Sequence, residues 1–513
     1  DTNGALKGIV GGNRGKEGNR IWNRASDTTR QIGSTIKPIT SYVLGIEKDL
    51  ITYSTVIEDR QVVINPDEVS YSQPLWVPKN EYNSFKGFVT VRTALIGSIN
   101  TVAVQITQKL GTTTSYDFLK YSLNVDTLTA GDNSYSPMAL GSLSKGMTLV
   151  KLAGAYQMFG NGGVRTEPYS YTRVEDTYGN VILEKNTVPV RVISAETATV
   201  MNRLLQEVTG WEGTGAAANL GGMNIPVAGK TGTNSDYGSV YFAGMTPYYT
   251  ATVWIGHDDF TPKLKSKSTG GKYAAPLWKA FMSKIHEGLQ NKPIIDESPN
   301  EIGLEKCTVC SISGKLATDA CYTDSSGHLP VTDWFAKDAA PAEVCDMHVQ
   351  TSICQDSGQL ASPYCYYVIS GSVVLIHNDS MYADIDPILV KQYIPNAVYT
   401  GVTSEEYAMT MEGGSMGATC SLHTPSWYNY GGGNEDLQNA KQEAQRLIRE
   451  IGNYLNNVQN ISDTDRNTLI QGMQDLEDYV NASLTEYIKR ATEQLRLNFN
   501  AIYEENPPVG AGW

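Results

Sequence analysis

The sequence predicts a mixed α/β or α+β domain, followed by a cysteine-containing extension and a C-terminal helical hairpin. Strand-like and helix-like stretches alternate over residues 1–290, all seven cysteines come after that range, and residues 434–506 are polar and helix-forming. The chain has 513 residues, which exceeds the size at which a single hydrophobic core stops growing. Two or more domains are therefore expected.

Hydrophobic periodicity assigns the main elements of the first domain. Residues 34–50 and 89–111 have helical periodicity, and the second stretch is interrupted near its middle. Residues 239–259 alternate aromatic and β-branched residues, which predicts two strands around a Thr-Pro turn. The opening DTNGALKGIVGG predicts a turn at Asn3-Gly4 and the second strand of a hairpin, so we interpret the domain as truncated at its front.

A stretch rich in Pro, Asn and Glu at residues 291–303 is typical of a linker, and the cysteine-containing extension, residues 304–430, follows it. The seven cysteines are Cys307, Cys310, Cys321, Cys345, Cys354, Cys365 and Cys420. A Cys-x10-Cys pattern occurs twice, from Cys310 to Cys321 and from Cys354 to Cys365. We interpret this repeat as two loops closed by disulfides in a separate unit, which indicates an oxidising, extracytoplasmic location.

A zinc site is the alternative interpretation of the cysteines. It would combine Cys307 and Cys310, spaced Cys-x-x-Cys, with Cys345 and His348, spaced Cys-x-x-His. We favour the disulfides because this four-ligand grouping is irregular and the repeat pairs the cysteines differently. The sequence therefore predicts no metal and no cofactor.

The last part of the chain predicts one more strand and a helix pair. The strand is expected at residues 370–378. After the glycines at 431–433, two helix-forming stretches separated at Ser462-Asp463 fill residues 434–506. They predict an antiparallel helical hairpin that serves packing or partner binding.

Charge and hydropathy exclude two classes of interaction. The net charge of −14 argues against binding of nucleic acid, because contacts with its phosphates need clustered Lys and Arg. The sequence as given has no apolar run of about 18 residues and no signal-peptide pattern at its start. We expect membrane attachment only through an anchor that this sequence does not contain.

The first chemical motif places Lys37 three positions after Ser34, at the predicted start of a helix. The two residues would lie one helical turn apart on the same face, and Pro38 is tolerated in a first turn. Free N–H groups and the helix dipole would favour the alkoxide of Ser34. Lys37 would accept the proton if burial and a second cation, Lys230, kept its amine neutral. In the alternative reading, Ser34 is only an N-cap.

The second motif, Ser98-Ile99-Asn100, falls where the helical pattern of residues 89–111 is interrupted. A loop at this position would direct both polar side chains into a cleft. Ser98 would relay a proton between the lysines and a leaving amine, and Asn100 would bind the substrate's peptide group. The alternative is a plain helix–helix turn with polar caps.

The third motif, Lys230-Thr231-Gly232-Thr233, follows an apolar stretch that is typical of a strand end. Alternation on a strand puts Lys230 and Gly232 on one face, and a glycine lets a ligand backbone approach closely. Lys230 and the Thr233 hydroxyl would bind a carboxylate, and the N–H groups of Ser34 and Thr233 would form an oxyanion hole. We assign Thr231, Gly232 and Thr233 to substrate binding.

In this order, the three motifs make up the serine–lysine set of penicillin-binding proteins and β-lactamases. Residues 1–285 resemble the transpeptidase domain of a class A penicillin-binding protein, also in RQIGSTIKP, GWEGTGAAA, VAGKTGT and YFAGMTPYYTATVWIGHDD. The segments SGKLATDAC and SGQLASPYC are similar to C-terminal extensions of such enzymes in Gram-positive anaerobes. The resemblance implies an α+β transpeptidase fold, an antiparallel sheet flanked by helices, for residues 1–290. One departure is Ile99, where many β-lactamases carry Asp or another polar residue.

The resemblance also implies an activity, that of a serine DD-transpeptidase. Ser34 would attack the D-Ala-D-Ala end of a peptidoglycan stem peptide, form an acyl-enzyme and pass the acyl group to the amine of a neighbouring stem peptide. β-Lactam antibiotics would acylate the same serine. The protein would act on the cell-wall face of the plasma membrane, where cell-division or elongation proteins are candidate partners. The implied catalytic residues are Ser34, Lys37, Ser98, Asn100 and Lys230.

Other functions stay open on the sequence. Hydrolysis of the acyl-enzyme would make the protein a DD-carboxypeptidase or a β-lactamase. A chain that does not turn over its substrate would be a β-lactam sensor or a cell-wall binding scaffold.

Residues 413–417 fit the G-x-S-x-G pattern of α/β-hydrolases, but His423 is too near to complete a triad, so we interpret them as a glycine-rich loop. His286-Glu287 lacks the second histidine of an H-E-x-x-H helix.

Overall fold

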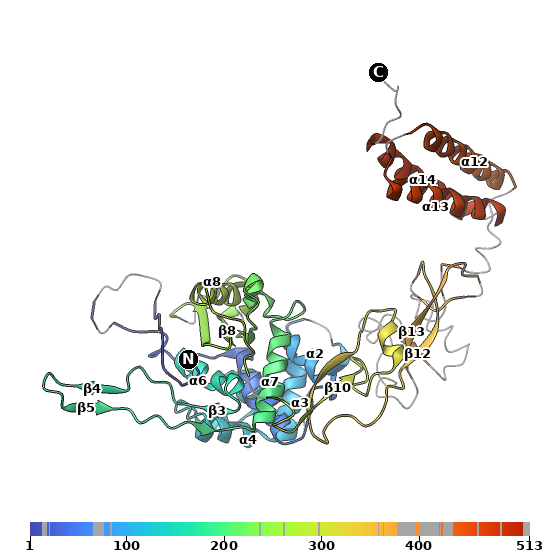
Figure 1. Cartoon of the computed structure of the whole chain (residues 1–513). Coiled ribbons are helices and arrows are strands. Elements are labelled where there is room, and N and C mark those ends of the chain that lie inside the picture. The colour runs from blue at the N-terminus through green and yellow to red at the C-terminus, as the bar shows by residue number, and fades with distance from the viewer. Residues whose placement is uncertain are drawn as a thin grey trace. The chain divides into compact units, whose positions relative to one another are not determined.

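The computed structural model divides into two compact units, residues Asp1–Ser352 with Ser370–Ala418, and residues Ile353–Ile369 with Thr419–Trp513 (Figure 1). The G-x-S-x-G pattern at 413–417 lies outside the residues that the structure describes. The described residues are 1–12, 18–19, 21–64, 76–82, 85–234, 237–259, 262–295, 298–357, 359–362, 364–376, 397–399, 420, 422–423, 434–458, 461–482 and 485–505.

The predicted helix over residues 34–50 is confirmed as a run of three helical segments. They are the 3-10 helix η1 (Gly33–Ile36), the π-helix η2 (Pro38–Tyr42) and the α-helix α1 (Val43–Glu47). Pro38 stands at the first position of η2, where its missing N–H breaks no helical hydrogen bond. The run is buried on nearly all sides, and its apolar side chains from Ile36 to Leu44 belong to the core of the first unit.

An antiparallel sheet lies beside this buried helical run. Its strands are β7 (Ala228–Thr233), β8 (Ser239–Met245) and β9 (Thr250–Gly256), in the order β7-β8-β9. Alternate residues of β8 face opposite layers. Phe242 packs with Trp278 of α8 (Ala275–Ile285), whereas Tyr241 belongs to the core that contains α6 (Leu149–Gly160) and α7 (Ala195–Val208). The two strands predicted around the Thr-Pro turn are confirmed.

The predicted interruption of the helix over residues 89–111 is also confirmed. Helix α2 (Val91–Ile96) is separated by three residues from helix α3 (Asn100–Leu110). The Thr90 side chain caps α2 by accepting a hydrogen bond from the backbone N–H of Thr93. Ser98 therefore lies in a short connection between two buried helices.

The other elements of the first domain are short. The sheet pairs β1-β2, β3-β6 and β4-β5 are antiparallel. The bounds are β1 (Val56–Asp59), β2 (Gly87–Thr90), α4 (Thr112–Asp117), η4 (Phe118–Ser122), η5 (Ala130–Asp132), α5 (Tyr135–Leu140), β3 (Val164–Arg165), β4 (Arg173–Glu175), β5 (Val181–Glu184), β6 (Val190–Arg191), η6 (Ala216–Ala218), η7 (Gly221–Met223) and η9 (Gly270–Ala274).

The first part of the cysteine-containing extension packs on the first domain, contrary to the predicted separate unit. Strands β10 (Leu304–Val309) and β11 (Val331–Ala336) pair antiparallel. Phe335 is buried in the core and makes an edge-to-face contact with Tyr53, with ring centroids 6.1 Å apart. Ile294 of the predicted linker is buried in the same core. Apolar side chains on these segments bury more surface by packing there than they would in a free linker.

The cysteines differ from the prediction, because all seven are free. Cys310 and Cys321 do lie together, as do Cys354 and Cys365, but a third cysteine and a histidine join each pair. The predicted two disulfides are therefore replaced by two groups of four side chains. The surrounding elements are η10 (Asp319–Thr323), β12 (His348–Cys354), β13 (Val368–Ile376) and β14 (Ala397–Tyr399), of which β13 confirms the strand predicted at 370–378.

The described residues of the second unit form three helices where the sequence predicted a hairpin of two. They are α12 (Asn434–Asn457), α13 (Asp463–Ala482) and α14 (Thr485–Glu505), with a shared core that includes Leu447, Leu476 and Phe499. The boundary between α13 and α14 was not visible in the sequence because no Gly or Pro occurs between Met473 and Glu505. Among the described residues, no helix is both long enough and apolar enough to span a membrane.

Candidate active site

Close backbone packing between η1 and β7 positions Ser34. Gly33 has φ of +56°, and a Cβ atom there would lie 2.5 Å from the carbonyl oxygen of Thr233. A Cβ atom on Gly232 would lie 2.7 Å from the carbonyl oxygen of Ile32. Only glycine fits these two positions without displacing the backbone opposite. The half-buried Ser34 is thereby held at the end of β7 that carries Thr233.

Lys37 is fully buried one turn after Ser34 and donates hydrogen bonds to the second motif. Its Nζ atom lies 2.6 Å from the carbonyl oxygen of Ser98, 3.3 Å from Ser98 Oγ and 2.6 Å from Asn100 Oδ1. Asn100 donates in turn to the carbonyl oxygen of Lys79, at 2.6 Å. The side chain of Lys37 is therefore held in one place by the loop between α2 and α3.

The backbone of Ser98 has an uncommon conformation that makes this arrangement possible. Its φ is +56°, in the left-handed region that few residues other than glycine adopt. In this conformation both its carbonyl and its hydroxyl accept hydrogen bonds from lysines. Lys37 Nζ donates to both oxygens, and Lys230 Nζ lies 2.8 Å from Ser98 Oγ. Such strain is typical of functional sites.

Lys230 comes from the middle of β7 and is also fully buried. Besides Ser98, its Nζ donates to the carbonyl oxygen of Thr231 at 3.2 Å and to Thr231 Oγ1 at 3.4 Å. The Thr231 hydroxyl donates to Thr214 Oγ1 at 3.0 Å. Thr233, at the end of the strand, accepts a hydrogen bond from the backbone N–H of Gly270 at 3.3 Å.

Burial of two lysines in one network lowers the pKa of both. The pKa of Lys37 falls well below 10.5, first because burial disfavours its charged form and second because Lys230 is near, although Glu81 opposes the shift. Burial lowers the pKa of Lys230 to about 7. A buried amine that is neutral near physiological pH can accept a proton, which an exposed lysine cannot do.

The structure brings the sequence-predicted residues to one place. Lys37, Ser98, Asn100, Lys230 and Thr231 form one hydrogen-bonded network. The other three predicted residues lie beside this network through the backbone packing of η1 against β7, and they are Ser34, Gly232 and Thr233.

Sequence reasoning missed a buried carboxylate that supports the network. Asp59 at the end of β1 accepts hydrogen bonds from the Asn80 side-chain amide at 2.7 Å, the Thr101 hydroxyl at 2.5 Å and the Tyr82 hydroxyl at 3.0 Å. The Asn80 amide oxygen in turn accepts from the backbone N–H of Asn100 at 3.0 Å. No spacing rule links these residues, so only the tertiary structure reveals them.

Comparison with known proteins places these features in a family. Residues 2–283 match the family described as penicillin binding protein transpeptidase domain, and residues 302–350 match penicillin-binding protein 1A, C-terminal domain. Penicillin-binding protein 1A of Clostridium botulinum (strain Hall) is 37% identical over 383 residues, which cover 74% of this chain and 44% of the relative. Penicillin-binding protein 1A of Clostridium tetani is 35% identical over 357 residues, which cover 67% and 43%. The chain thus spans less than half the length of these relatives.

A solved structure shares the fold. Penicillin-Binding Protein 1A from Haemophilus influenzae superposes with a TM-score of 0.53 at 24% sequence identity, covering 63% of this chain and 50% of that one. The resemblance to a class A penicillin-binding protein transpeptidase domain, drawn from the motifs, is confirmed by the family match. Because residues 2–283 make up more than half of the chain, this protein belongs to the penicillin-binding protein transpeptidase family.

Proposed function

We propose that this chain is a serine DD-transpeptidase that cross-links peptidoglycan stem peptides through an acyl-enzyme on Ser34. One observation carries the proposal. The Ser98 hydroxyl bridges two fully buried lysines, at 3.3 Å from Lys37 Nζ and 2.8 Å from Lys230 Nζ. Of these two lysines, Lys37 lies one helical turn after Ser34. A proton-transfer chain of this kind suits acyl transfer by a serine that has a lysine base.

In the acylation step, neutral Lys37 directs its two N–H bonds at the Ser98 carbonyl oxygen and Asn100 Oδ1, and its lone pair takes the proton of the Ser34 hydroxyl. The Ser34 oxygen attacks the carbonyl carbon of the penultimate D-Ala. The backbone N–H groups of Ser34 and Thr233 stabilise the oxyanion that forms. When the C–N bond breaks, the leaving D-Ala amine receives a proton from Lys37 through Ser98. A β-lactam ring opens by the same attack, and its amine stays attached to the acyl group.

Substrate binding uses groups at the edge of β7. Lys230 in its charged form and the Thr233 hydroxyl bind the terminal carboxylate of the donor peptide, and Asn100 binds its peptide group. Gly232 allows the donor backbone to approach the strand closely. Thr231 holds Lys230 through the hydrogen bonds described above.

In the second step, the amine of a neighbouring stem peptide attacks the acyl-enzyme and Ser34 regains its proton. This substrate places the protein outside the cytoplasm, on the cell-wall face of the plasma membrane, with cell-division or elongation proteins as candidate partners.

The test is intact-mass spectrometry of the purified chain after incubation with benzylpenicillin. We expect a stable adduct of one drug mass, because deacylation by water is slow in a site built for an amine acceptor. Ser34→Ala should abolish the adduct, and the matched control Ser26→Ala, an exposed serine in the same segment, should retain it.

Two outcomes would contradict the proposal. A folded chain without an adduct would favour a scaffold that binds the cell wall. Rapid hydrolysis of the drug without accumulation of the adduct would point to a β-lactamase. Release of D-Ala from a synthetic stem peptide, measured with and without an added amine acceptor, separates transpeptidase from carboxypeptidase.

A further inference from the structure

A group of four buried side chains converges in the first unit, away from the candidate active site. Its members are Cys310, Cys321, Cys345 and His348, whose ligand atoms all lie within 4.8 Å of one another. His348 Nδ1 is 3.4 Å from Cys310 Sγ and 3.5 Å from Cys345 Sγ. A tetrahedral Zn²⁺ with Zn–S bonds of about 2.3 Å and Zn–N bonds of about 2.1 Å separates its ligand atoms by about 3.6–3.8 Å. The side chains are therefore spaced as ligands of one ion.

A second group with the same composition occurs in the second unit. Its members are Cys354, Cys365, Cys420 and His423, also within 4.8 Å of one another. His423 Nδ1 is 3.1 Å from Cys420 Sγ and 3.4 Å from Cys354 Sγ. Both groups combine a Cys-x10-Cys pair with a Cys-x2-His pair, although the segment between the two pairs is longer in the second group. The two groups thus contain the same set of side chains, three cysteines and one histidine, although the segments that connect their two pairs differ in length.

An acidic side chain stands behind each histidine. In the first group, His348 Nε2 lies 3.8 Å from a carboxylate oxygen of buried Asp324. In the second group, His423 Nε2 lies 3.5 Å from a carboxylate oxygen of Asp356. Histidines that bind metals with one ring nitrogen commonly present the other to a carboxylate, which fixes the ring and increases its basicity. In both groups, Nε2 of the histidine faces the carboxylate and Nδ1 faces the sulfur atoms.

Hydrogen-bond donors point at the sulfur atoms, as thiolate ligands require. The backbone N–H groups of Ile312 and Ser313 both donate to Cys310 Sγ, at 3.3 Å. In the second group, the backbone N–H of Ser362 donates to Cys365 Sγ at 3.2 Å. These donors stabilise negative charge on sulfur, which a disulfide does not carry.

The disulfide interpretation leaves part of each group unexplained. A bond between Cys310 and Cys321 would use two sulfurs and leave Cys345 and His348 buried against it without a shared role. A four-coordinate ion uses all four side chains. The zinc set considered from the sequence shares Cys310, Cys345 and His348 with this group, but it has Cys307, which lies outside the group, in place of Cys321.

We propose that the two groups are structural Zn²⁺ sites of the Cys₃His type, each closed by four protein ligands. Zn²⁺ is the ion that such closed sites of thiolate and imidazole ligands favour. Bound there, each ion ties a Cys-x10-Cys loop to a Cys-x2-His turn. This inference goes beyond the proposed acyl transfer and does not depend on it.

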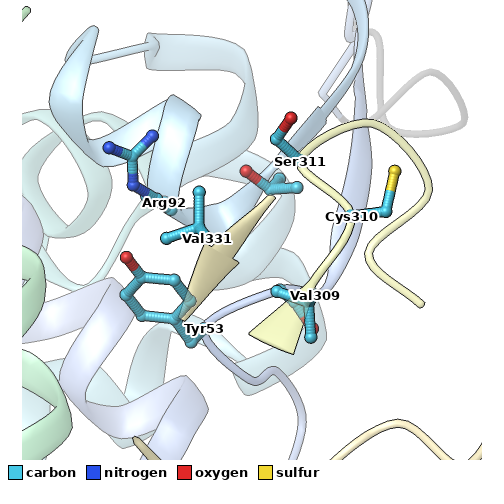
Figure 2. A pocket seen from close by; sticks show the side chains of 8 residues that line it. Tyr53, Arg92, Val309, Cys310, Ser311 and Val331 are labelled. Atoms are coloured by element: carbon cyan, nitrogen blue, oxygen red, sulfur yellow. The ribbon is translucent and has the colours of Figure 1, made fainter. Parts of the chain in front are cut away.

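The first site also fastens the extension to the transpeptidase domain. Its loop packs directly on the domain, because a Cβ atom on Gly314 would collide with the carbonyl oxygen of Ser54. Cys310 itself lines a pocket with Tyr53 and Arg92 of the domain (Figure 2). A metal at this site would hold in place the strands that cover Tyr53.

The test is the metal content of the full chain, measured by inductively coupled plasma mass spectrometry after dialysis. We expect two Zn²⁺ ions per chain and six thiols that react only after denaturation with a chelator, whereas the thiol of Cys307, which lies outside both groups, should react without the chelator. His348→Ala and His423→Ala should each lower the content to one ion, and the double variant should hold none. Cys307→Ser is the matched control, because it removes a cysteine outside both groups, and it should keep two ions.

Other results would overturn the proposal. A zinc-free chain whose intact mass is lighter by two hydrogens for each disulfide would restore the disulfide interpretation. Iron in place of zinc would refute the choice of metal. If the variants fail to fold, Co²⁺ replacement in the unaltered chain decides. Saturation at two ions with the intense visible bands of tetrahedral, thiolate-bound cobalt supports the sites, and a weak octahedral spectrum refutes them. None of these readouts depends on penicillin binding.

Discussion

At the scale of single residues, the two buried lysines set the chemistry of the site. Burial lowers both pKa values, and the mutual repulsion adds to the effect on Lys37. The roles in the proposed mechanism require opposite states, because Lys37 must be neutral to accept a proton while Lys230 must be charged to bind a carboxylate. Two interacting groups titrate as a pair, so the activity should report two apparent pKa values.

We predict a bell-shaped dependence of the rate of acylation by benzylpenicillin on pH. The rate falls at low pH as Lys37 becomes protonated, and it falls above about pH 7 as Lys230 loses its charge. Lys230→Arg should remove the alkaline limb, since a guanidinium remains charged at these pH values. Stopped-flow measurements between pH 5 and 9 check this, and an alkaline limb that persists in Lys230→Arg would rule out Lys230 as its source.

At the scale of elements, the contact between η1 and β7 depends on Gly33. We predict that Gly33→Ala lowers the acylation rate roughly 10-fold or more, because the new Cβ atom would lie 2.5 Å from the Thr233 oxygen and displace the strand end. Gly179→Ala is the matched control. Gly179 also has a positive φ, of +86°, but nothing lies within 4 Å of its Cβ position, so we expect only a cost of about 1 kcal/mol in stability. Equal acylation rates in the two variants would contradict the role of this contact.

The connection before α3 depends on Asp59 in a similar way. We predict that Asp59→Asn lowers the free energy of unfolding by about 2 kcal/mol, because an amide cannot accept all the hydrogen bonds that the buried carboxylate accepts. The acylation rate should fall as well, since Asn80 and Asn100 lose their support. Asp176→Asn, in an exposed turn, should change neither quantity. Urea denaturation and acylation kinetics measure both, and an unchanged rate in Asp59→Asn would show that Asn100 is held by other contacts.

At the scale of the whole molecule, the first part of the extension, up to Ser352, belongs to the first compact unit. Arg203 of α7 lies 3.3 Å from the carboxylate of buried Asp333 on β11, and Phe335 covers Tyr53. These contacts connect the extension to the helix that packs against β7. This first part of the extension therefore stabilises the domain without contributing a residue to the network of lysines.

We predict that Phe335→Ala lowers the free energy of unfolding of the first unit by about 3–5 kcal/mol, since it leaves a cavity in the core. The acylation rate at 25 °C should stay near that of the unaltered chain, because the lysine network lies elsewhere. Tyr322→Ala removes an aromatic side chain that is 57% exposed, and it should have little effect. Differential scanning calorimetry with fluorescent penicillin labelling tests both parts. A loss of labelling in folded Phe335→Ala would reveal a link between the extension and the site.

Local patterns predicted much of the fold and of the site. Periodicity located the buried helical run after Ser34, the interruption at Ser98 and the two strands around the Thr-Pro turn, because burial imposes a period of 3.6 or 2 on apolar residues. The three motifs predicted which side chains form the candidate site. The packing of β11 on Tyr53 and the end of α13 before Thr485 have no such local signature, so the sequence predicted neither.

By itself, the sequence determined the family of this protein and the residues of its three motifs, since fixed spacing on a helix start, a loop and a strand encodes that chemistry. Only the tertiary structure decided which cysteines meet. Cys345 and Cys420 lie far along the sequence from the Cys-x10-Cys pairs that they join, and distances between sulfur atoms depend on the fold and not on separation in the sequence. The sequence did not predict the role of Asp59 for the same reason, because its hydrogen bonds join three separate segments around the candidate active site.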